Sequence, residues 1–481
     1  MTVRIRERSF GGVEAFSQNP GADIVDRRSF LSAGIALSGA SALSAASYER
    51  VSGANERVGV GFIGFGLIGK RHVLDFKSQA DADLVALAEV HRGRLDEGAA
   101  LMGSDVKKHT DFRRLLDDRD VQGVVVSTPD HWHALMTMLA CAAGKDVYVE
   151  KPLTLFVREG RWMSDVAQHT KRVVQVGTQQ RSGRHYQRAR QLIKEGHLGR
   201  IVSVRVEVAR NIFPGFGSPR DQEPPAELDW DLWLGPAPKR PYNPNRAIYH
   251  FRWFWDYSGG QTTNWGAHSF DIVDWVISLD KLRGISSSGG RFCLQDNGET
   301  PDLQDALFEF DGWNAIWSMR ECACGETPRF PLTFFGTKGS LGISRQGFKV
   351  TPDLDVPPAS LIPQFVSHPI GGPLTVKASG QRRFRTEGFE DKSGDDRAQF
   401  VDHVRNFLDC VKSRKQPLSD LESAHRAVTA CHLANLSLRL GRKLRWDAAR
   451  EEIVGDAEAA KSLVRPYRQP WDRELKAMGV G

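Results

Sequence analysis

Residues 58–69, Val-Gly-Val-Gly-Phe-Ile-Gly-Phe-Gly-Leu-Ile-Gly, begin as an apolar, β-branched strand and end as a loop with the spacing Gly-x-Gly-x-x-Gly. In such a loop Gly64 allows the tight turn, Gly66 lets a pyrophosphate approach the backbone, and Gly69 lets the next helix pack closely on the strand. The phosphates then meet the partial positive charge of the helix N-terminus. Glu89 stands 20 residues beyond Gly69, the spacing of a ribose-binding acid. The stretch therefore predicts a dinucleotide-binding domain.

Strand and helix patterns continue to alternate up to about residue 178. Strands separated by helical segments of this length predict right-handed parallel crossovers and a doubly wound parallel sheet. We therefore expect an α/β Rossmann domain over residues 58–178. The expected strands are 58–63, 83–88, 123–127, 146–149 and 173–176, and the expected helices are 68–77, 94–102, 111–116, 133–143 and 157–169.

The pattern changes beyond Gly177, where a stretch rich in proline and tryptophan at 213–255 separates scattered helices and strand-like pieces. This texture is typical of an α+β domain. We expect a C-terminal domain with a large, mostly antiparallel sheet over residues 179–448, and a C-terminal tail at 449–481. The expected helices are 183–195, 267–277, 397–412 and 420–440, and the expected strands are 201–208, 306–310, 315–319 and 331–344.

Length and composition describe an ordinary soluble protein. The 481 residues suggest two or three domains of roughly 100 to 200 residues, and we expect two. The formal charge of +6 is spread along the chain without a basic stripe, which argues against a nucleic-acid partner. Six cysteines do not make a disulfide framework in a chain of this size. Cys322 and Cys324 have no second pair at zinc spacing, so we expect buried thiols and no metal site.

The N-terminus carries a candidate address. Asp-Arg-Arg-Ser-Phe-Leu at 26–31 leads into an uncharged run of small and apolar residues at 31–46, which resembles a twin-arginine export signal. A run of 16 residues is shorter than the about 20 that a membrane span needs, so we expect no stable span after cleavage. The expected organisation is a signal peptide at 1–46 and a linker at 47–57, with export by the twin-arginine translocase to a periplasmic or extracytoplasmic location. A disordered N-terminus that is not an export signal is the alternative.

Four motifs in a fixed order carry a family resemblance. They are the glycine loop at 64–69, Thr-Pro-Asp-His-Trp-His at 128–133, Glu-Lys-Pro at 150–152, and Gly-Gly-Gln-Thr-Thr-Asn-Trp-Gly-Ala-His-Ser-Phe-Asp at 259–271. Together they resemble the Gfo/Idh/MocA oxidoreductase family, and most of all its exported, twin-arginine members. The resemblance covers residues 58 to about 448. It implies a Rossmann domain joined to a domain whose open sheet serves homo-oligomerisation, and hydride transfer on sugars, glycosides or cyclitols.

The resemblance also implies a nicotinamide cofactor, and export of an already folded protein implies that this cofactor is held tightly. Glu89 can accept hydrogen bonds from both ribose hydroxyls and would repel a 2′-phosphate, which favours NAD. Arg92 and Arg94 follow closely, so NADP remains an alternative. The residues expected to contact the cofactor are Gly64, Gly66, Leu67, Ile68, Gly69, Glu89, Thr128, Pro129, His131, His133, Glu150 and Lys151.

Three residues match positions where the family performs its chemistry. Lys151 matches the active-site lysine, whose ammonium can polarise the substrate oxygen, and His268 matches the catalytic histidine. Asn264 is a departure, because the family pattern has an aspartate four residues before the histidine. An amide can hold a hydroxyl by hydrogen bonds but cannot accept a proton. Acid–base chemistry would therefore rest on Lys151 and His268.

Four further residues are candidate substrate contacts. Trp253 and Trp265 offer flat faces that suit a sugar ring, with core filling as the alternative. Arg181 can bind hydroxyls or a carboxylate, or form an ion pair between the domains. Asp271 can orient the His268 imidazole or cap its helix.

Three functions remain open on these residues. The first is an oxidoreductase that oxidises a secondary hydroxyl or reduces the matching ketone. The second is an NAD-dependent glycosidase that oxidises the sugar transiently, eliminates the aglycone and then reduces the product. The third is a catalytically silent sugar-binding protein, which Asn264 motivates.

Overall fold

The computed structural model describes residues 57–323, 325, 327–355 and 383–480. The expected signal peptide at 1–46 lies outside the described residues, and so does the linker up to residue 56. No helix in the described ranges is both long and apolar enough to cross a membrane.

The N-terminal sheet has six parallel strands in the order β3-β2-β1-β4-β5-β6. Residues of β1, β4, β5 and β6 are all buried, because apolar strands covered on both faces form the centre of a parallel sheet. The doubly wound parallel sheet is thereby confirmed. Its strands are β1 Val58–Ile63, β2 Ala82–Ala88, β3 Lys107–His109, β4 Gly123–Val126, β5 Asp146–Val149 and β6 Val174–Val176.

Helices cover both faces of this sheet. Four of the five begin within two residues of the expected start, and α5 begins at Asp130, three residues early. Pro129 precedes it and Asp130 lies in its first turn, which is a common helix start. The helices are α2 Leu67–Lys77, α3 Arg92–Met102, α4 Phe112–Leu116, α5 Asp130–Ala142 and α6 Val157–Thr170.

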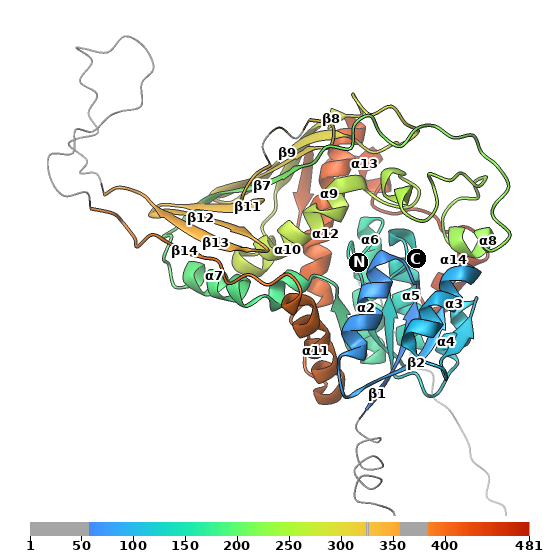
Figure 1. Ribbon diagram of the computed structural model, residues 1–481. Coiled ribbons are helices and arrows are strands. Elements are labelled where there is room, and N and C mark those ends of the chain that lie inside the picture. The colour runs from blue at the N-terminus through green and yellow to red at the C-terminus, as the bar shows by residue number, and fades with distance from the viewer. Residues whose placement is uncertain (1–56, 324, 326, 356–382, 481) are drawn as a thin grey trace, which may run out of the picture. The chain divides into compact units, whose positions relative to one another are not determined.

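Segments from the end of the chain complete the cover of this sheet (Figure 1). Phe407 of α11 (Ala398–Ser413) packs against Phe76 and Tyr148 on one face. On the other face, Trp471 of α14 (Trp471–Ala477) packs against Trp132 with ring centroids 4.8 Å apart. The expected tail at 449–481 therefore contributes to the N-terminal core.

The second sheet has ten strands in the order β14-β13-β12-β11-β7-β10-β9-β8-β15-β16. Only β7 and β10 pair in parallel, which confirms the mostly antiparallel sheet. The expected strand at 331–344 is in fact a hairpin of β11 and β12. The strands are β7 Ile201–Ala209, β8 Gly284–Gly290, β9 Leu303–Phe310, β10 Trp313–Arg320, β11 Leu332–Gly336, β12 Gly339–Ser344, β13 Gly347–Pro352, β14 Phe389–Asp391, β15 Leu444–Asp447 and β16 Glu452–Ile453.

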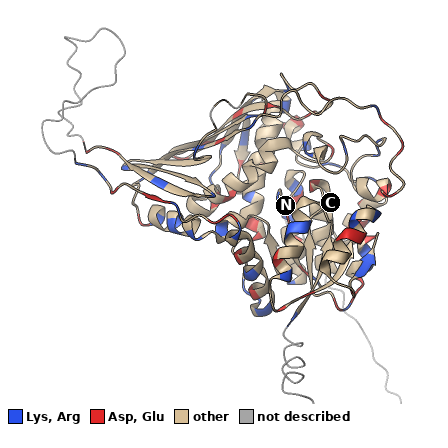
Figure 2. Cartoon of the chain, viewed as in Figure 1, with Lys and Arg blue, Asp and Glu red and all other residues tan. Residues whose placement is uncertain are grey.

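Helices of the C-terminal part cover one face of the ten-stranded sheet and join it to the Rossmann sheet. Helix α12 (Leu421–Leu440) packs on β8 and also on α6 and α10, so it belongs to both cores. Figure 2 shows Lys and Arg interspersed with Asp and Glu over these elements. The remaining helices are η1 Gln179–Ser182, α7 Arg184–Lys194, α8 Trp230–Leu234, η2 His250–Trp253, α9 Gly260–Asn264, α10 Gly266–Ile277 and α13 Ala457–Lys461.

Candidate active site

The glycine loop has the geometry that a pyrophosphate needs. Gly64 has φ +91°, and a Cβ there would lie 2.8 Å from the Ser127 carbonyl oxygen. Gly69 packs against the Gly64 carbonyl with no room for a side chain. A Cβ on Gly66, by contrast, would meet no atom within 4 Å, and Gly66 stands at the N-terminus of α2. Open space in front of the helix N–H groups fits a phosphate.

A cavity of about 380 Å³ extends from this loop. Glu89 lies at its wall, with Oε2 accepting from the Phe65 N–H at 2.7 Å and Oε1 from the His91 N–H at 2.9 Å. Arg94 lines the same cavity. The expected cofactor residues that line it are Gly64, Gly66, Leu67, Ile68, Glu89, Thr128 and Pro129.

The opposite wall comes from a part of the chain for which the sequence predicted no cofactor contact. Leu228, Leu232 and Trp233 come from the stretch around α8. They close over the cavity together with Arg252 of η2 and Tyr249, which precedes η2. More than a hundred residues separate them from the glycine loop, and their spacing has no nucleotide signature. The residues that line the cavity therefore fit an elongated ligand with phosphates at one end and an apolar cover.

Three expected cofactor contacts are corrected. His131 and His133 belong to the first turn of α5 and are buried there, and His131 Nε2 lies 3.0 Å from the Trp233 carbonyl oxygen. Both ring nitrogens of His133 face carbonyl oxygens, those of Pro152 at 2.7 Å and Thr128 at 2.9 Å. Glu150 is 2% exposed and does not line the cavity. Because α5 starts at Asp130, the two imidazoles turn inward and hold the backbone of the loops around the site.

Glu150 is fully enclosed among polar partners. His72 Nε2 lies 2.7 Å from its Oε1, Gln179 Nε2 donates to the same oxygen at 2.8 Å, and the Lys151 N–H donates to Oε2 at 3.1 Å. Burial raises the pKa of Glu150, but the hydrogen bond and charge of His72 outweigh it, so the pKa is lowered. An ionised Glu150 thus fixes the backbone from which the Lys151 side chain extends.

Lys151 and Asn264 meet although 113 residues separate them. Lys151 Nζ donates to Asn264 Oδ1 at 2.8 Å and lies 3.4 Å from the Asn264 carbonyl oxygen. Burial lowers the pKa of Lys151 to about 8, and the charges of Arg252 and Arg345 act in the same direction. An amine with this pKa can exchange a proton near neutral pH.

His268 lies on α10 beside the same group. Its ring is buried and its centroid is 6.1 Å from that of Trp265. Burial, followed by the charges of Lys151 and Arg345, holds the pKa of His268 well below its usual value. The imidazole is therefore neutral at pH 7, and among the described residues its Nδ1 has no hydrogen-bond partner.

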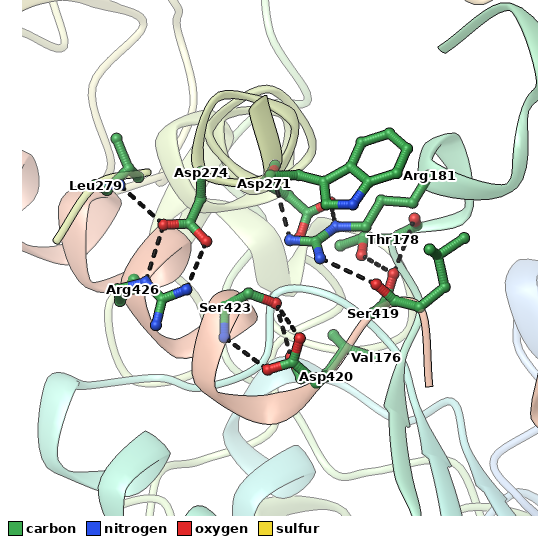
Figure 3. Close-up of polar contacts among 12 residues, drawn as sticks. Val176, Thr178, Arg181, Asp271, Asp274, Leu279, Ser419, Asp420, Ser423 and Arg426 are labelled. Carbon is green, nitrogen blue, oxygen red and sulfur yellow. Dashed lines mark hydrogen bonds and ion pairs between the residues drawn. The ribbon is translucent and has the colours of Figure 1, made fainter. Parts of the chain in front are cut away.

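The expected substrate contacts Arg181 and Asp271 are corrected. Figure 3 shows them facing each other: Arg181 Nε donates to Asp271 Oδ2 and Nη2 to Oδ1, both at 2.8 Å. Both side chains are about 2% exposed or less. Asp271 is therefore turned away from His268 and does not orient it. The neighbouring pair of Asp274 and Arg426 joins α10 to α12 in the same way.

The two tryptophans expected to contact substrate, Trp253 and Trp265, differ in how far they are exposed. Trp253 is 1% exposed and its Nε1 donates to Glu321 Oε2 at 2.7 Å, so it fills the core and is corrected as a substrate contact. Trp265 is 37% exposed, and its role against substrate stays a prediction. The Arg345 guanidinium lies 5.7 Å from the Trp265 ring centroid. Sequence reasoning did not identify Arg345, which the turn between β12 and β13 brings to the site.

Comparison with known proteins identifies both domains. The model of an oxidoreductase family with an NAD-binding Rossmann fold matches residues 58–178, and the model of the same family's C-terminal alpha/beta domain matches 183–288 and 393–473. The two models together match well over half of the chain.

Curated relatives and solved structures agree with this assignment. The scyllo-inositol 2-dehydrogenase (NAD(+)) of Bacillus subtilis is 24% identical over 81% of this chain and 96% of its own. A glycosyl hydrolase family 109 protein of a Shewanella species is 30% identical over 31% of this chain and 34% of its own. An NAD binding oxidoreductase from Klebsiella pneumoniae has the same fold, with a TM-score of 0.60 at 19% identity over 81% of this chain and 99% of that one. A levoglucosan dehydrogenase in complex with NADH and levoglucosan also has a TM-score of 0.60, at 18% identity and the same coverage.

Proposed function

Because the chain belongs to the Gfo/Idh/MocA family of NAD-binding oxidoreductases, we propose that it transfers a hydride between a nicotinamide cofactor and a secondary hydroxyl, or the matching ketone, of a sugar, glycoside or cyclitol. The contact of Lys151 with Asn264 carries the proposal. It lies where β5 ends, at the edge of the parallel sheet that also holds the glycine loop, and open α/β sheets bind their ligands at this edge. The inositol and levoglucosan dehydrogenases support a polyhydroxylated substrate.

Each residue of the site has a distinct task under this proposal. The glycine loop, Glu89, Thr128 and Pro129 hold NAD, which supplies or accepts the hydride. Lys151 hydrogen-bonds the reacting oxygen and moves its proton, since its pKa of about 8 makes both protonation states accessible. His268, neutral and without a partner for its Nδ1 among the described residues, offers a second hydrogen-bonding group to the substrate.

The choice between NAD and NADP is tested together with the reaction. Glu89 at the cavity wall favours NAD, and Arg94 on the same wall leaves NADP as the alternative. The protein is purified without added cofactor, and the absorbance and mass of what heat releases are recorded, followed by titration with both nucleotides. A tightly held nicotinamide is expected. No released nicotinamide together with no binding of either nucleotide would refute the proposal.

The reaction itself is tested with inositols, levoglucosan and a panel of sugars. Lys151→Ala should lose turnover and still bind NAD, because residue 151 does not line the cavity that extends from the glycine loop. A protein without turnover on any of these sugars, whose Lys151→Ala variant binds sugar as the wild type does, would instead support a silent sugar-binding protein.

A glycosidase is the second candidate, favoured by the relation to a glycosyl hydrolase family 109 protein. In that reaction the cofactor returns to its starting state, so the aglycone leaves without net formation of NADH. A chromogenic glycoside distinguishes the two functions: release of the aglycone at constant NADH absorbance supports the glycosidase, and accumulation of NADH supports the dehydrogenase.

Export and assembly are part of the proposal. The Arg-Arg pair at 27–28 before the uncharged run supports secretion by the twin-arginine route, where a tightly held cofactor would cross with the folded protein. Replacing both arginines by lysine should retain the protein in the cytoplasm on fractionation.

The outer face of the ten-stranded sheet presents Leu307, Ile316 and Phe335 among polar side chains, which supports pairing with a second copy. Light scattering coupled to gel filtration measures the assembly, and a monomer would contradict it.

A further inference from the structure

A chain of polar groups runs from Lys151 into the protein interior. Lys151 Nζ donates to Asn264 Oδ1 at 2.8 Å, Asn264 Nδ2 donates to Gln261 Oε1 at 3.0 Å, and Gln261 Nε2 donates to Glu321 Oε1 at 2.8 Å. Gln261 and Asn264 are three residues apart on α9, so they share one helix face. Glu321 follows β10 directly and is 0% exposed. These three hydrogen bonds thus link Lys151 at the candidate active site to the C-terminal core.

The two ends of this chain decide how the amides between them must point. A lysine ammonium can only donate hydrogen bonds, whereas an ionised carboxylate can only accept them. Gln261 must therefore give its NH₂ to Glu321, which leaves its carbonyl oxygen facing Asn264. Asn264 must then give its NH₂ to Gln261, and its own carbonyl oxygen faces Lys151. Any other orientation sets two donors or two acceptors against each other.

The carboxyl group at the far end acts as an acceptor toward each of its three partners. Trp253 Nε1 donates to Glu321 Oε2 at 2.7 Å, and Arg210 Nε lies 3.4 Å from Oε1. With Gln261, these are three donors around one side chain. Burial raises the pKa of Glu321 above its usual value, and the three donors offset only part of that increase.

We propose that Glu321 is a positioning residue which, through Gln261, turns the Asn264 carbonyl oxygen toward Lys151, and that this pair makes an amide at position 264 the matched choice for the site. The inference rests on the proposed function, in which Lys151 acts on the substrate oxygen. It explains the departure at residue 264: an aspartate there would face the Gln261 carbonyl oxygen. If Gln261 turned round, its oxygen would face Glu321 instead.

The orientation rule predicts which substitutions fail and which pair recovers. Asn264→Asp sets two acceptors against each other, and Glu321→Gln leaves one junction of the chain without a matched donor and acceptor. In the double variant, the new amide at position 321 donates its NH₂ to the Gln261 carbonyl oxygen, and the Gln261 NH₂ turns to the new carboxylate at position 264. That carboxylate also accepts from Lys151. The carbonyl oxygen of the amide at position 321 remains free to accept from Trp253, so the junctions from Lys151 to Trp253 are again matched and only the contact with Arg210 is lost.

The test measures kcat, KM and NAD affinity for the wild type and these three variants. Each single variant should lower kcat by roughly tenfold or more, the worth of one mispaired buried hydrogen bond, with NAD affinity unchanged. The double variant should recover most of the lost kcat. The pH profile adds a second readout, because the carboxylate of Asn264→Asp should raise the pKa of Lys151. Glu159→Gln is the matched control: Glu159 is equally buried and accepts from Tyr467, but lies outside the chain, so Asn264→Asp should not rescue it.

Thermal unfolding of the same proteins separates this inference from the proposed function. The double variant should melt above the temperature expected from adding the two single effects. If the protein oxidises no sugar but its variants show such coupling, the result would support the hydrogen-bonded series from Lys151 to Glu321 and refute the proposed dehydrogenase activity. The opposite outcome is an active wild type in which the effects of the two single variants on kcat multiply and their shifts in melting temperature add. It would refute the role of Glu321 and leave the proposed dehydrogenase activity standing.

Discussion

Lys151 should give the reaction a pH dependence that a surface lysine would not give. Removing the ammonium from water lowers its pKa from 10.5 to about 8, chiefly by burial, and Arg252 and Arg345 add to the effect. At pH 7 a pKa of about 8 makes the neutral amine more abundant by a factor of roughly 300 than a pKa of 10.5 would. In the oxidising direction the neutral amine takes the hydroxyl proton. The rate should therefore rise about tenfold per pH unit below pH 8 and level off above it.

The assay is the initial rate of NADH formation at saturating substrate and NAD over the neutral and alkaline range. Two variants test whether Lys151 causes the rising limb of the pH–rate profile below about pH 8. Lys151→Arg keeps the positive charge but cannot lose its proton in this range, so both the limb and the turnover should disappear. Arg252→Leu removes a nearby charge that lowers the lysine pKa, so its limb should move to higher pH.

His268 should contribute no limb near its usual pKa, because burial keeps its imidazole neutral there. The reasoning on Lys151 is refuted if the rate is flat between about pH 6 and pH 9, or if the limb stays in place in Arg252→Leu. Circular dichroism at each pH serves as the control that the protein remains folded.

Further predictions concern the glycine loop, the ion pair of Arg181 with Asp271, and the pH dependence of stability. Gly66→Ala should leave the melting temperature unchanged, since its φ is −82° and its Cβ meets open space, but should weaken NAD binding by at least about tenfold; Gly69→Ala should instead destabilise by about 1–3 kcal/mol. Calorimetry of both variants checks this contrast, and an unstable Gly66→Ala would contradict it. Arg181→Met leaves Asp271 buried without its partner and should cost about 3–5 kcal/mol in urea unfolding, whereas adding Asp271→Leu should recover much of it. Equal losses in the single and double variants would contradict the ion pair. Burial raises the pKa of Glu159 from 4.5 to about 7, so the folded state holds this proton more tightly and the free energy of unfolding should fall as pH rises from about 4.5 to about 7. Glu159→Gln should lose that component of the slope, and an unchanged difference between the two proteins across this range would rule it out.

The sequence predicted those parts of the fold that depend on local patterns. The strands β1 and β5 have the predicted ends because apolar, β-branched runs are bounded by turn residues on both sides. Strand β8, Gly-Ile-Ser-Ser-Ser-Gly-Gly, was not predicted, since its residues have low strand propensity and it is held by pairing with β9 and β15. Its structure is set by tertiary contacts.

The site divides along the same line. Lys151, Asn264 and His268 come together as the motifs implied, but the motif pattern did not show which side chains turn inward. The placement of His131 and His133 depends on where α5 starts, and the Pro129-Asp130 pair was the signal for that start. Glu321 had no signal at all, since its role depends on Gln261, 60 residues earlier in the chain.

An asparagine at position 264 is compatible with a working enzyme for an electrostatic reason as well. A carboxylate 2.8 Å from Lys151 Nζ would favour the ammonium and raise the pKa of the lysine, which would make the neutral amine scarce at pH 7. The amide satisfies the same hydrogen bond without that charge. Burial and the two arginines can then keep the pKa near 8, so that one residue both binds the reacting oxygen and moves its proton. Under this proposal the Glu321–Gln261 pair holds the amide in place and Lys151 carries the proton.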